Sequence, residues 1–337
     1  MKVSILKRSI NKVLQIALPI LLGAGILLWT YKGFDFERAW QVMGGNMEWS
    51  WMLFSFVFAT SAHLFRGWRW KLALTPIGEK TTNAHCVYAV FISYAVNLVI
   101  PRIGEAWRCG ILSRCDRVSF PKALGTVVVE RILDAICVLL MVAFTLLIQS
   151  DAFAALFNKT GTNIGFFSEL FTSTNFYISL VSIMALLILL YFLMRNLSLF
   201  TRVKTVLKKV WQGCMALKHV ENLPLYLFYT VGIWGSYFLE FYVTFFCFDF
   251  SASLGWMPAL VMFVAGSIAV VVPTPNGAGP WHFVVITLMM MYGVSKDDAG
   301  IFALLVHGIQ TFLLILLGIY GWIALKLENK EKVDNNI

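Results

Sequence analysis

Six ionisable side chains lie within or beside two consecutive apolar segments: Arg102, Glu105, Arg108, Glu130, Arg131 and Asp134. An ionised side chain costs roughly 2.5–3.5 kcal/mol in hydrocarbon on insertion scales, so such groups normally line an enclosed or wet site. Guanidinium groups match phosphate oxygens in a bidentate arrangement. These residue types predict a site for an anionic group at membrane depth, where Glu105, three residues from both Arg102 and Arg108, is expected to orient the arginines.

Two interpretations of these charges are open. Glu130 and Asp134 are four residues apart and share a helix face, and Arg131 is three residues from Asp134. In a structural network, Glu130 or Asp134 pairs with Arg102 or Arg108 and holds the helix in place. In a functional site, Arg131 and Arg102 bind a lipid phosphate. One network could serve both purposes.

A second set of candidates follows in the C-terminal half: Glu240, Asn276, Gly277, Gly279, His282 and His307. In PTPNGAGP, Gly277 and Gly279 would let backbone amides approach an anion, although a turn that only reverses the chain is the alternative. Glu240, His282 and His307 are candidates for a proton-linked or head-group site. Hydrogen-bonded structural roles are the competing interpretation.

Composition places these residues in a membrane protein. The chain has 337 residues, of which 59% are hydrophobic and only 13% charged. Several apolar segments reach about the 20 residues that a membrane helix needs, and the pattern predicts an all-α polytopic protein. The segments lie at about 10–30, 50–66, 84–100, 122–149, 175–194, 224–248, 256–272 and 300–325, with shorter ones at about 103–114 and 278–292.

Two proline-containing breaks, PRIG and PTPNGAGP, predict helical hairpins that enter and leave the membrane on one side. This arrangement puts 22 Lys and Arg residues on the cytoplasmic side against 4 outside, with both termini cytoplasmic. The order of segments then repeats in halves at about 10–149 and 175–325, with inverted orientation and a broken re-entrant hairpin in each. Residues 1–325 form one transmembrane domain, and 326–337 are expected to be a disordered cytoplasmic tail.

Other classes of protein find little support. The net charge of +9 is explained by loop residues that set topology and attract anionic lipids, so nucleic acid is not an expected partner. The six cysteines have no paired CxxC spacing, and neither a metal nor a cofactor is expected. His63, Arg66, Arg69 and Lys71, with Trp68 and Trp70 between them, are typical of an anchor at the membrane interface, with head-group recruitment as the alternative.

The run PRIGEAWRCGILSRCDRVSFPKALGTVVVERILD, followed later by PTPNGAGPWHF, resembles the transmembrane flippase module of the lysylphosphatidylglycerol synthase family. That family has an R-x-G-E segment, an E-R pair on the next helix and a glycine-containing break in its second half. The resemblance covers about residues 50–325. This chain differs from the family where Asn276 replaces a frequent Gly and His282 replaces a common Glu.

The resemblance implies a flippase of the bacterial cytoplasmic membrane that moves an anionic, aminoacylated or polyprenyl-linked lipid between leaflets. Synthase activity is not expected, because no segment reads as the soluble transferase domain. A membrane-embedded lipid-modifying transferase using Glu130 or Asp134 as general base is one alternative. A non-transporting membrane partner of a lipid or envelope biosynthetic enzyme is another. A homo-oligomer and a separate biosynthetic enzyme are further candidate partners.

Overall fold

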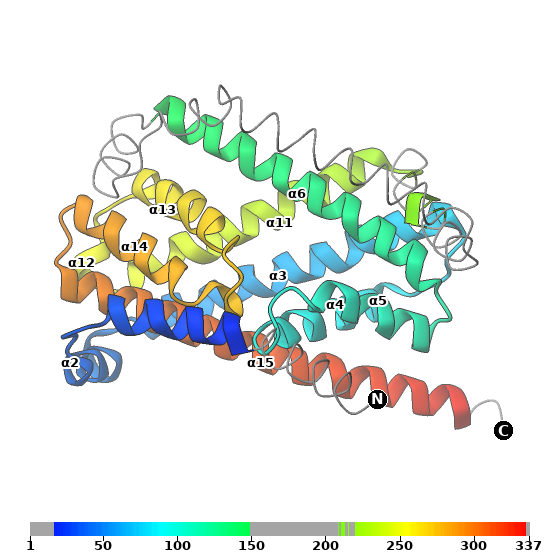
Figure 1. The fold of residues 1–337 in the computed structure, drawn as a ribbon, viewed down its shortest axis with the longest axis horizontal. Coiled ribbons are helices and arrows are strands. Elements are labelled where there is room, and N and C mark those ends of the chain that lie inside the picture. The colour runs from blue at the N-terminus through cyan, green and yellow to red at the C-terminus, as the bar shows by residue number, and fades with distance from the viewer. Residues whose placement is uncertain (1–16, 149–207, 209, 213–214, 216–219, 335–337) are drawn as a thin grey trace, which may run out of the picture.

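The computed structural model describes residues 17–148, 208, 210–212, 215 and 220–334. Every regular element in this described part is helical, which confirms the all-α prediction (Figure 1). The predicted segment at 175–194 lies outside the described residues. Two described helices, Phe120–Ile148 and the stretch Lys296–Glu328, are long and apolar enough to cross a membrane by length and composition.

The described helices of the first half are Ala17–Thr30, α2 (Phe36–Gln41), α3 (Trp49–Leu74), α4 (Asn83–Asn97), α5 (Gly104–Cys115) and α6 (Phe120–Ile148). Those of the second half are α11 (Leu223–Val243), α12 (Asp249–Ala252), α13 (Trp256–Ala269), α14 (Pro280–Met291) and α15 (Lys296–Asp334). Short turns of other helix types are η1 (Val42–Asn46), η2 (Thr75–Ile77), η4 (Thr244–Cys247) and η5 (Pro275–Gly277). Both predicted breaks therefore separate two helices.

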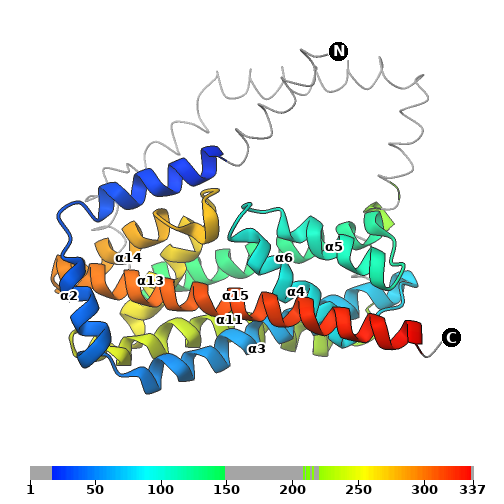
Figure 2. The same ribbon diagram turned by 90° about the horizontal axis from the view of Figure 1, so that it is seen from below.

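Helices α3 and α11 pack antiparallel and lie side by side along one face of the molecule (Figures 1 and 2). Near one end, the Glu48 amide donates to the Cys247 carbonyl at 2.9 Å. Towards the other end, Arg69 donates to the Thr230 hydroxyl at 3.2 Å. The start of α3 thus lies beside the residues that follow α11, and the end of α3 lies beside the first part of α11, so the two helices run in opposite directions.

The first hairpin, α4 and α5, begins and ends at the same end of the molecule. The Thr81 hydroxyl, before α4, donates to Asp116, after α5, at 2.6 Å. The tip of this hairpin meets the second hairpin, α13 and α14, where the Arg102 guanidinium donates to the Val271 carbonyl. Figure 2 shows the two tips side by side. Arg102 and Asn276 both follow a proline and both have positive φ, 65° and 51°.

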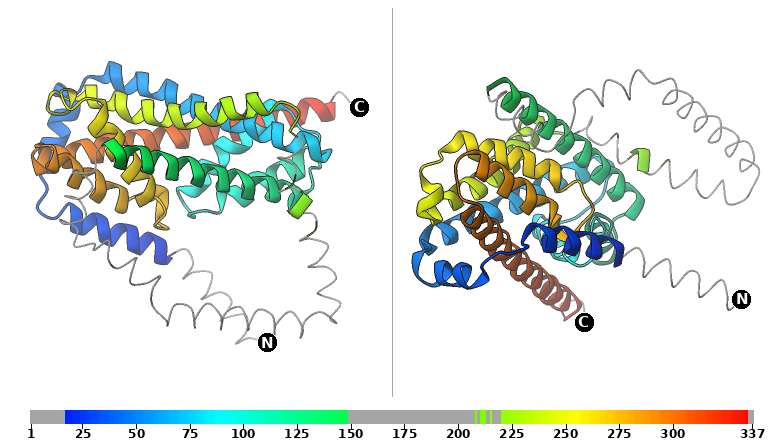
Figure 3. Two further views of the ribbon diagram at one scale, coloured as in Figure 1. Left: turned by 90° about the horizontal axis from the view of Figure 1, so that it is seen from above. Right: turned by 60° about the vertical axis from the view of Figure 1, so that its left-hand side comes forward.

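Each hairpin also packs on the long helix of the other half. Helix α4 packs on α15, with Tyr88 and Phe91 against Tyr320, and α13 packs on α6. Helix Ala17–Thr30 covers the second hairpin (Figures 2 and 3), and Trp29 contacts the Phe283 ring at 5.4 Å. The apolar faces of the two halves are thus buried against each other.

Helix α15 continues to Asp334, past Leu325, where the sequence predicted that a disordered tail would begin. The residues KLENKEKVD are mostly strong helix formers, so nothing in them ends the helix. The buried His85 also holds this end, because its Nδ1 contacts Asp116 at 2.7 Å and its Nε2 contacts Glu328 at 2.8 Å. The last turns of α15 are therefore fastened to the first hairpin.

A glycine comparison tests the close packing within the first hairpin. A Cβ at Gly104 would lie 2.2 Å from the Ser93 carbonyl oxygen, whereas a Cβ at Gly110 on the same helix meets nothing within 4 Å. Gly104→Ala is therefore expected to lower the free energy of unfolding by about 1–3 kcal/mol through overpacking. Thermal unfolding in detergent measures the loss. Equal melting temperatures for Gly104→Ala and the control Gly110→Ala would contradict this packing.

Candidate functional site

A buried ion network joins α3 to α6. Arg66 donates to Asp134 Oδ2 at 2.7 Å, and Arg69 donates to Asp134 Oδ1 at 2.9 Å. Both arginines come from α3, three residues apart, so that they present their guanidinium groups on one face. Each Asp134 oxygen therefore receives its own arginine, and the charges are paired where water is excluded.

Glu130, one turn before Asp134, extends the network to α5. Arg108 donates to Glu130 Oε2, and Arg69 Nε lies 3.8 Å from Glu130 Oε1. Arg108 also lies over the Trp70 ring at 4.4 Å from its centroid, and Trp70 donates to the Thr126 hydroxyl at 3.0 Å. The Glu130 and Arg69 side chains are both 0% exposed, so this part of the network is fully enclosed.

The network reaches the surface only through Arg131 and Glu105 among its described members. The Arg131 side chain is 39% exposed and that of Glu105 29%, and their charged atoms are 3.7 Å apart. Arg131 also contacts Asp134 at 2.9 Å, but its Nε has no hydrogen-bond partner in the described part of the chain. One guanidinium is therefore both tied to the buried network and available at its edge.

The interface-anchor interpretation of Arg66 and Arg69 is wrong. Helix α3 continues to Leu74 instead of ending near residue 66, and both side chains are buried, at 3% and 0% exposed. His63, at 3% exposed, is buried one turn earlier on the same helix. The spacing of His63, Arg66 and Trp70 at i, i+3 and i+7 was the available signal, because it puts the three on one helix face.

Helix α11 closes the other side of Arg66. The guanidinium carbon lies 5.8 Å from the Tyr237 ring centroid and 6.0 Å from that of Tyr94. The two tyrosine hydroxyls are 3.0 Å apart, and the Tyr237 hydroxyl is 3.5 Å from His63 Nδ1. The rings and hydroxyls of the two tyrosines thus surround Arg66, which pairs with Asp134.

Arg102 forms no ion pair with Glu130 or Asp134. It is exposed at the hairpin tip, where it donates to the Val271 carbonyl near the C-terminal end of α13. Val271 lies two residues beyond the end of α13, so this contact joins the two tips outside the ion network. Of the two arginines that the sequence offered as partners for Glu130, the structure selects Arg108.

In the second hairpin, the glycine amides are already used within the loop. The Gly277 amide donates to the Thr274 carbonyl at 3.2 Å, and the Gly279 amide donates to His282 Nδ1 at 3.4 Å. Both glycines have positive φ, and a Cβ at Gly279 would lie 2.9 Å from the Gly23 carbonyl oxygen. The structure favours the interpretation in which the glycines form a turn, and the missing side chain of Gly279 leaves room for the backbone of helix Ala17–Thr30.

His282 and His307 lie together, with ring centroids 4.5 Å apart. His307 Nε2 is 3.1 Å from the Asn276 carbonyl oxygen, and the Asn276 side chain donates to Thr311 at 3.0 Å. The pair therefore fastens the second tip to α15. Glu240, on α11, makes no hydrogen bond or ion pair with either histidine among the described residues, so the three do not form one site.

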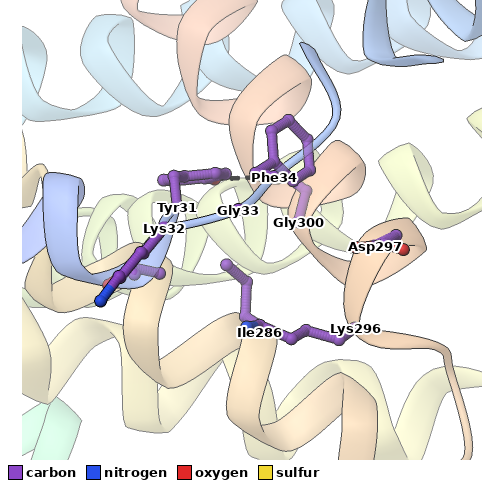
Figure 4. Close-up of a pocket in the computed structure, with 9 residues that line it drawn as sticks. Tyr31, Lys32, Gly33, Phe34, Ile286, Lys296, Asp297 and Gly300 are labelled. Atoms are coloured by element: carbon purple, nitrogen blue, oxygen red, sulfur yellow. Dashed lines mark hydrogen bonds between the residues drawn. The ribbon is translucent and has the colours of Figure 1, made fainter. Parts of the chain in front are cut away.

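A small pocket lies at the end of the first helix (Figure 4). Its volume is about 20 Å³, which is enough for about one water molecule. The Tyr31 hydroxyl donates to the Gly300 carbonyl at 3.2 Å beside it, which ties the first helix to α15. Among the described residues, no group of three or more His, Cys, Asp or Glu side chains is arranged to hold a metal ion.

The fold and this site define an all-α membrane protein with two helical hairpins whose tips meet beside a buried arginine and carboxylate network. Comparison with protein families matches residues 16–318 to the lysylphosphatidylglycerol synthase TM region. The chain therefore belongs to that family, and the matched part is a membrane module. Comparisons with curated proteins and with solved structures gave no significant match.

The network predicts unequal costs for neutralising its carboxylates. Asp134→Asn leaves Arg66 and Arg69 without their buried counter-charge, and breaking a buried pair costs about 3–5 kcal/mol. Glu105→Gln removes a partly exposed pair, which is worth less than about 1 kcal/mol. Melting temperatures in detergent are the measurement. If Glu105→Gln is as destabilising as Asp134→Asn, the division between core and edge is wrong.

Proposed function

We propose that this protein is a lipid flippase that moves an anionic, aminoacylated or polyprenyl-linked lipid between the leaflets of a bacterial cytoplasmic membrane. Membership of a lipid synthase's TM-region family supports a lipid substrate. The observation that carries the proposal is Arg131, a guanidinium held by the buried network and 39% exposed at its edge. In this proposal Arg131 binds the lipid phosphate.

The charge of the network fits an anionic group. Four arginines meet three carboxylates in it: Arg66, Arg69, Arg108, Arg131, Glu105, Glu130 and Asp134. Asp134 and Glu130 are each shared among several arginines in the interior. The uncompensated positive charge is therefore best satisfied at Arg131, where an outside group can approach.

The surroundings of Arg131 suit acyl chains. On α6, Val128, one turn before Arg131, and Ile132, next to it, are 41% and 54% exposed. A lipid whose phosphate binds the guanidinium would rest its chains on these apolar side chains. The phosphate would then lie deep in the membrane, where the free-energy cost of an unpaired charge is highest.

We also propose that the two halves are inverted repeats with re-entrant hairpins. Four observations support this: the same order of the described elements from α3 and from α11 onward, antiparallel α3 and α11, reciprocal packing of each hairpin on the other half's long helix, and a proline followed by a positive-φ residue at each tip. Inverted repeats with broken helices are a recurring plan of transporters that bind substrate near the midplane. Tips that meet at Arg102 and Val271 agree with this plan.

The transferase alternative is less well supported. It requires Glu130 or Asp134 to act as a general base with a lone pair facing the substrate. Both carboxylates are instead paired with arginines and buried, at 0% and 7% exposed. Arginine donors therefore take up the carboxylate oxygens that a general base would turn towards its substrate.

Transport in reconstituted liposomes tests the role of Arg131. Arg131→Gln is expected to reduce the rate at which fluorescent phosphatidylglycerol becomes accessible to an external quencher by tenfold or more, because a charge-assisted bond to phosphate is lost. Arg131→Lys restores part of the rate, since an ammonium keeps the charge without the bidentate fork.

The matched control for this experiment is Arg114→Gln, which removes an exposed arginine on α5 outside the network. Melting temperature and gel filtration confirm that each variant is folded. Wild-type transport above that of empty liposomes, with no reduction in Arg131→Gln, would remove Arg131 from the site. Wild-type transport no faster than empty liposomes would favour a non-transporting partner of a biosynthetic enzyme.

The proposed topology places the two ends of α3 on opposite sides, with both termini cytoplasmic. Single cysteines at the exposed positions Glu37 and Lys80 test it in a background without the native cysteines. A membrane-impermeant maleimide added to intact cells is expected to label Glu37→Cys and to leave Lys80→Cys unlabelled until the cells are opened. Labelling of both from outside would contradict the inverted arrangement.

A further inference from the structure

A hollow of about 290 Å³ opens at the end of the molecule where α2, η1, α12 and the start of α15 meet. It is separate from the buried ion network, which lies between α3, α5 and α6. Small-molecule pockets begin at about 300 Å³, so this hollow would hold a head group or a small solute and not an entire lipid. Its walls combine charged, amide and aromatic side chains.

One negative charge in this hollow is not neutralised. Arg38 pairs with Asp298 at 2.5 Å, and the Ser295 hydroxyl donates to the other Asp298 oxygen at 2.7 Å. Both carboxylate oxygens of Asp298 therefore already have partners. Asp249 also lines the hollow, where it is exposed, and within the described ranges it has no ion-pair partner. The side chains of the hollow thus carry one free carboxylate, which favours a cation.

Aromatic and amide groups complete a site for an ammonium ion. Phe248 and Phe250 flank Asp249 in sequence, line the hollow and stack with ring centroids 5.2 Å apart. Aromatic rings attract cations through their negative faces, and Phe250, which is partly buried, is the ring that a cation can reach, because Phe248 behind it is only 1% exposed. Gln41 from α2 and Asn46 from η1 also line the hollow and offer amide oxygens to N–H donors. A carboxylate, rings and amide oxygens together match the three donors and the charge of a primary ammonium group.

The hollow lies beside a group of exposed aromatic side chains. Trp40, next to Gln41, is 73% exposed, and Phe36 and Trp49 are 60% and 43% exposed. Exposed tryptophans collect at the level of lipid head groups. A head-group ammonium in the adjacent leaflet and a soluble amine can therefore both reach this hollow.

We propose that this hollow binds a primary ammonium group, with Asp249 as its counter-charge. The ammonium belongs to a lipid head group or to a soluble amine. The proposal does not depend on lipid translocation, because it concerns binding at residues outside the ion network.

Native mass spectrometry of the full-length protein in mild detergent tests the site with three probes: phosphatidylethanolamine, phosphatidylglycerol and free ethanolamine. Asp249→Asn removes the charge and keeps the shape. It is expected to weaken binding of at least one ammonium probe about tenfold or more, as for loss of a hydrogen bond to a charged group. Binding of phosphatidylglycerol, which has no ammonium, should not change.

Asp297→Asn is the matched control, since Asp297 is an exposed aspartate next to Asp298 that does not line the hollow. Gln41→Ala provides a second variant, from α2, with the same expected direction. Weakening of phosphatidylethanolamine alone identifies a lipid site, and weakening of ethanolamine as well identifies recognition of the ammonium itself. Equal binding of both ammonium probes by wild type and Asp249→Asn overturns the proposal. The proposal is also overturned if Asp249→Asn weakens the binding of phosphatidylglycerol as much as the binding of the ammonium probes.

Discussion

The arrangement of the first half depends on one constraint: an ionised side chain removed from water must have a counter-charge. Asp134 meets it with Arg66 and Arg69, and Glu130 meets it with Arg108. These contacts connect α3, α5 and α6, and Thr230 adds α11 through Arg69. Because an unpaired buried charge is far more costly than the net value of a pair, the network restricts these helices to positions in which each buried carboxylate meets an arginine. Packing of apolar side chains alone would allow more freedom.

The second half is held differently. Its hairpin carries no carboxylate or arginine at the positions that correspond to the first tip, and the loop is instead fastened by hydrogen bonds from Asn276 and His307 and by close packing at Gly279. Neutral hydrogen bonds cost less to separate than buried ion pairs. The contact from Arg102 to Val271 joins the two tips.

Binding and structure are divided among neighbouring residues of one helix. On α6, Glu130 and Asp134 face inward and serve the network, while Arg131 lies at its edge with part of its side chain exposed. A guanidinium that is already oriented by Asp134 and Glu105 loses little freedom when it binds a ligand, which is an advantage for affinity. Under the proposed function, the buried pairs that hold the helices together would therefore also orient Arg131 for a lipid phosphate.

Much of this protein follows from local sequence. Apolar segments of sufficient length require helices in a membrane, and proline with glycine ends a helix, so both hairpins and the charged segment of α6 were predictable within a few residues. The sequence did not allow a prediction of which charged side chains pair with one another. Arg66 and Arg69 lie more than 60 residues from Asp134, and their spacing with tryptophans is typical of an interface anchor, while Arg108 and Arg102 are equivalent choices for Glu130 in the sequence. The contact of Glu328, on α15, with His85 is likewise between residues far apart in the sequence. Local preferences decide where a helix begins and ends, but only the packed fold decides which distant charges share a site without water, because that depends on distances between helices that no single segment contains.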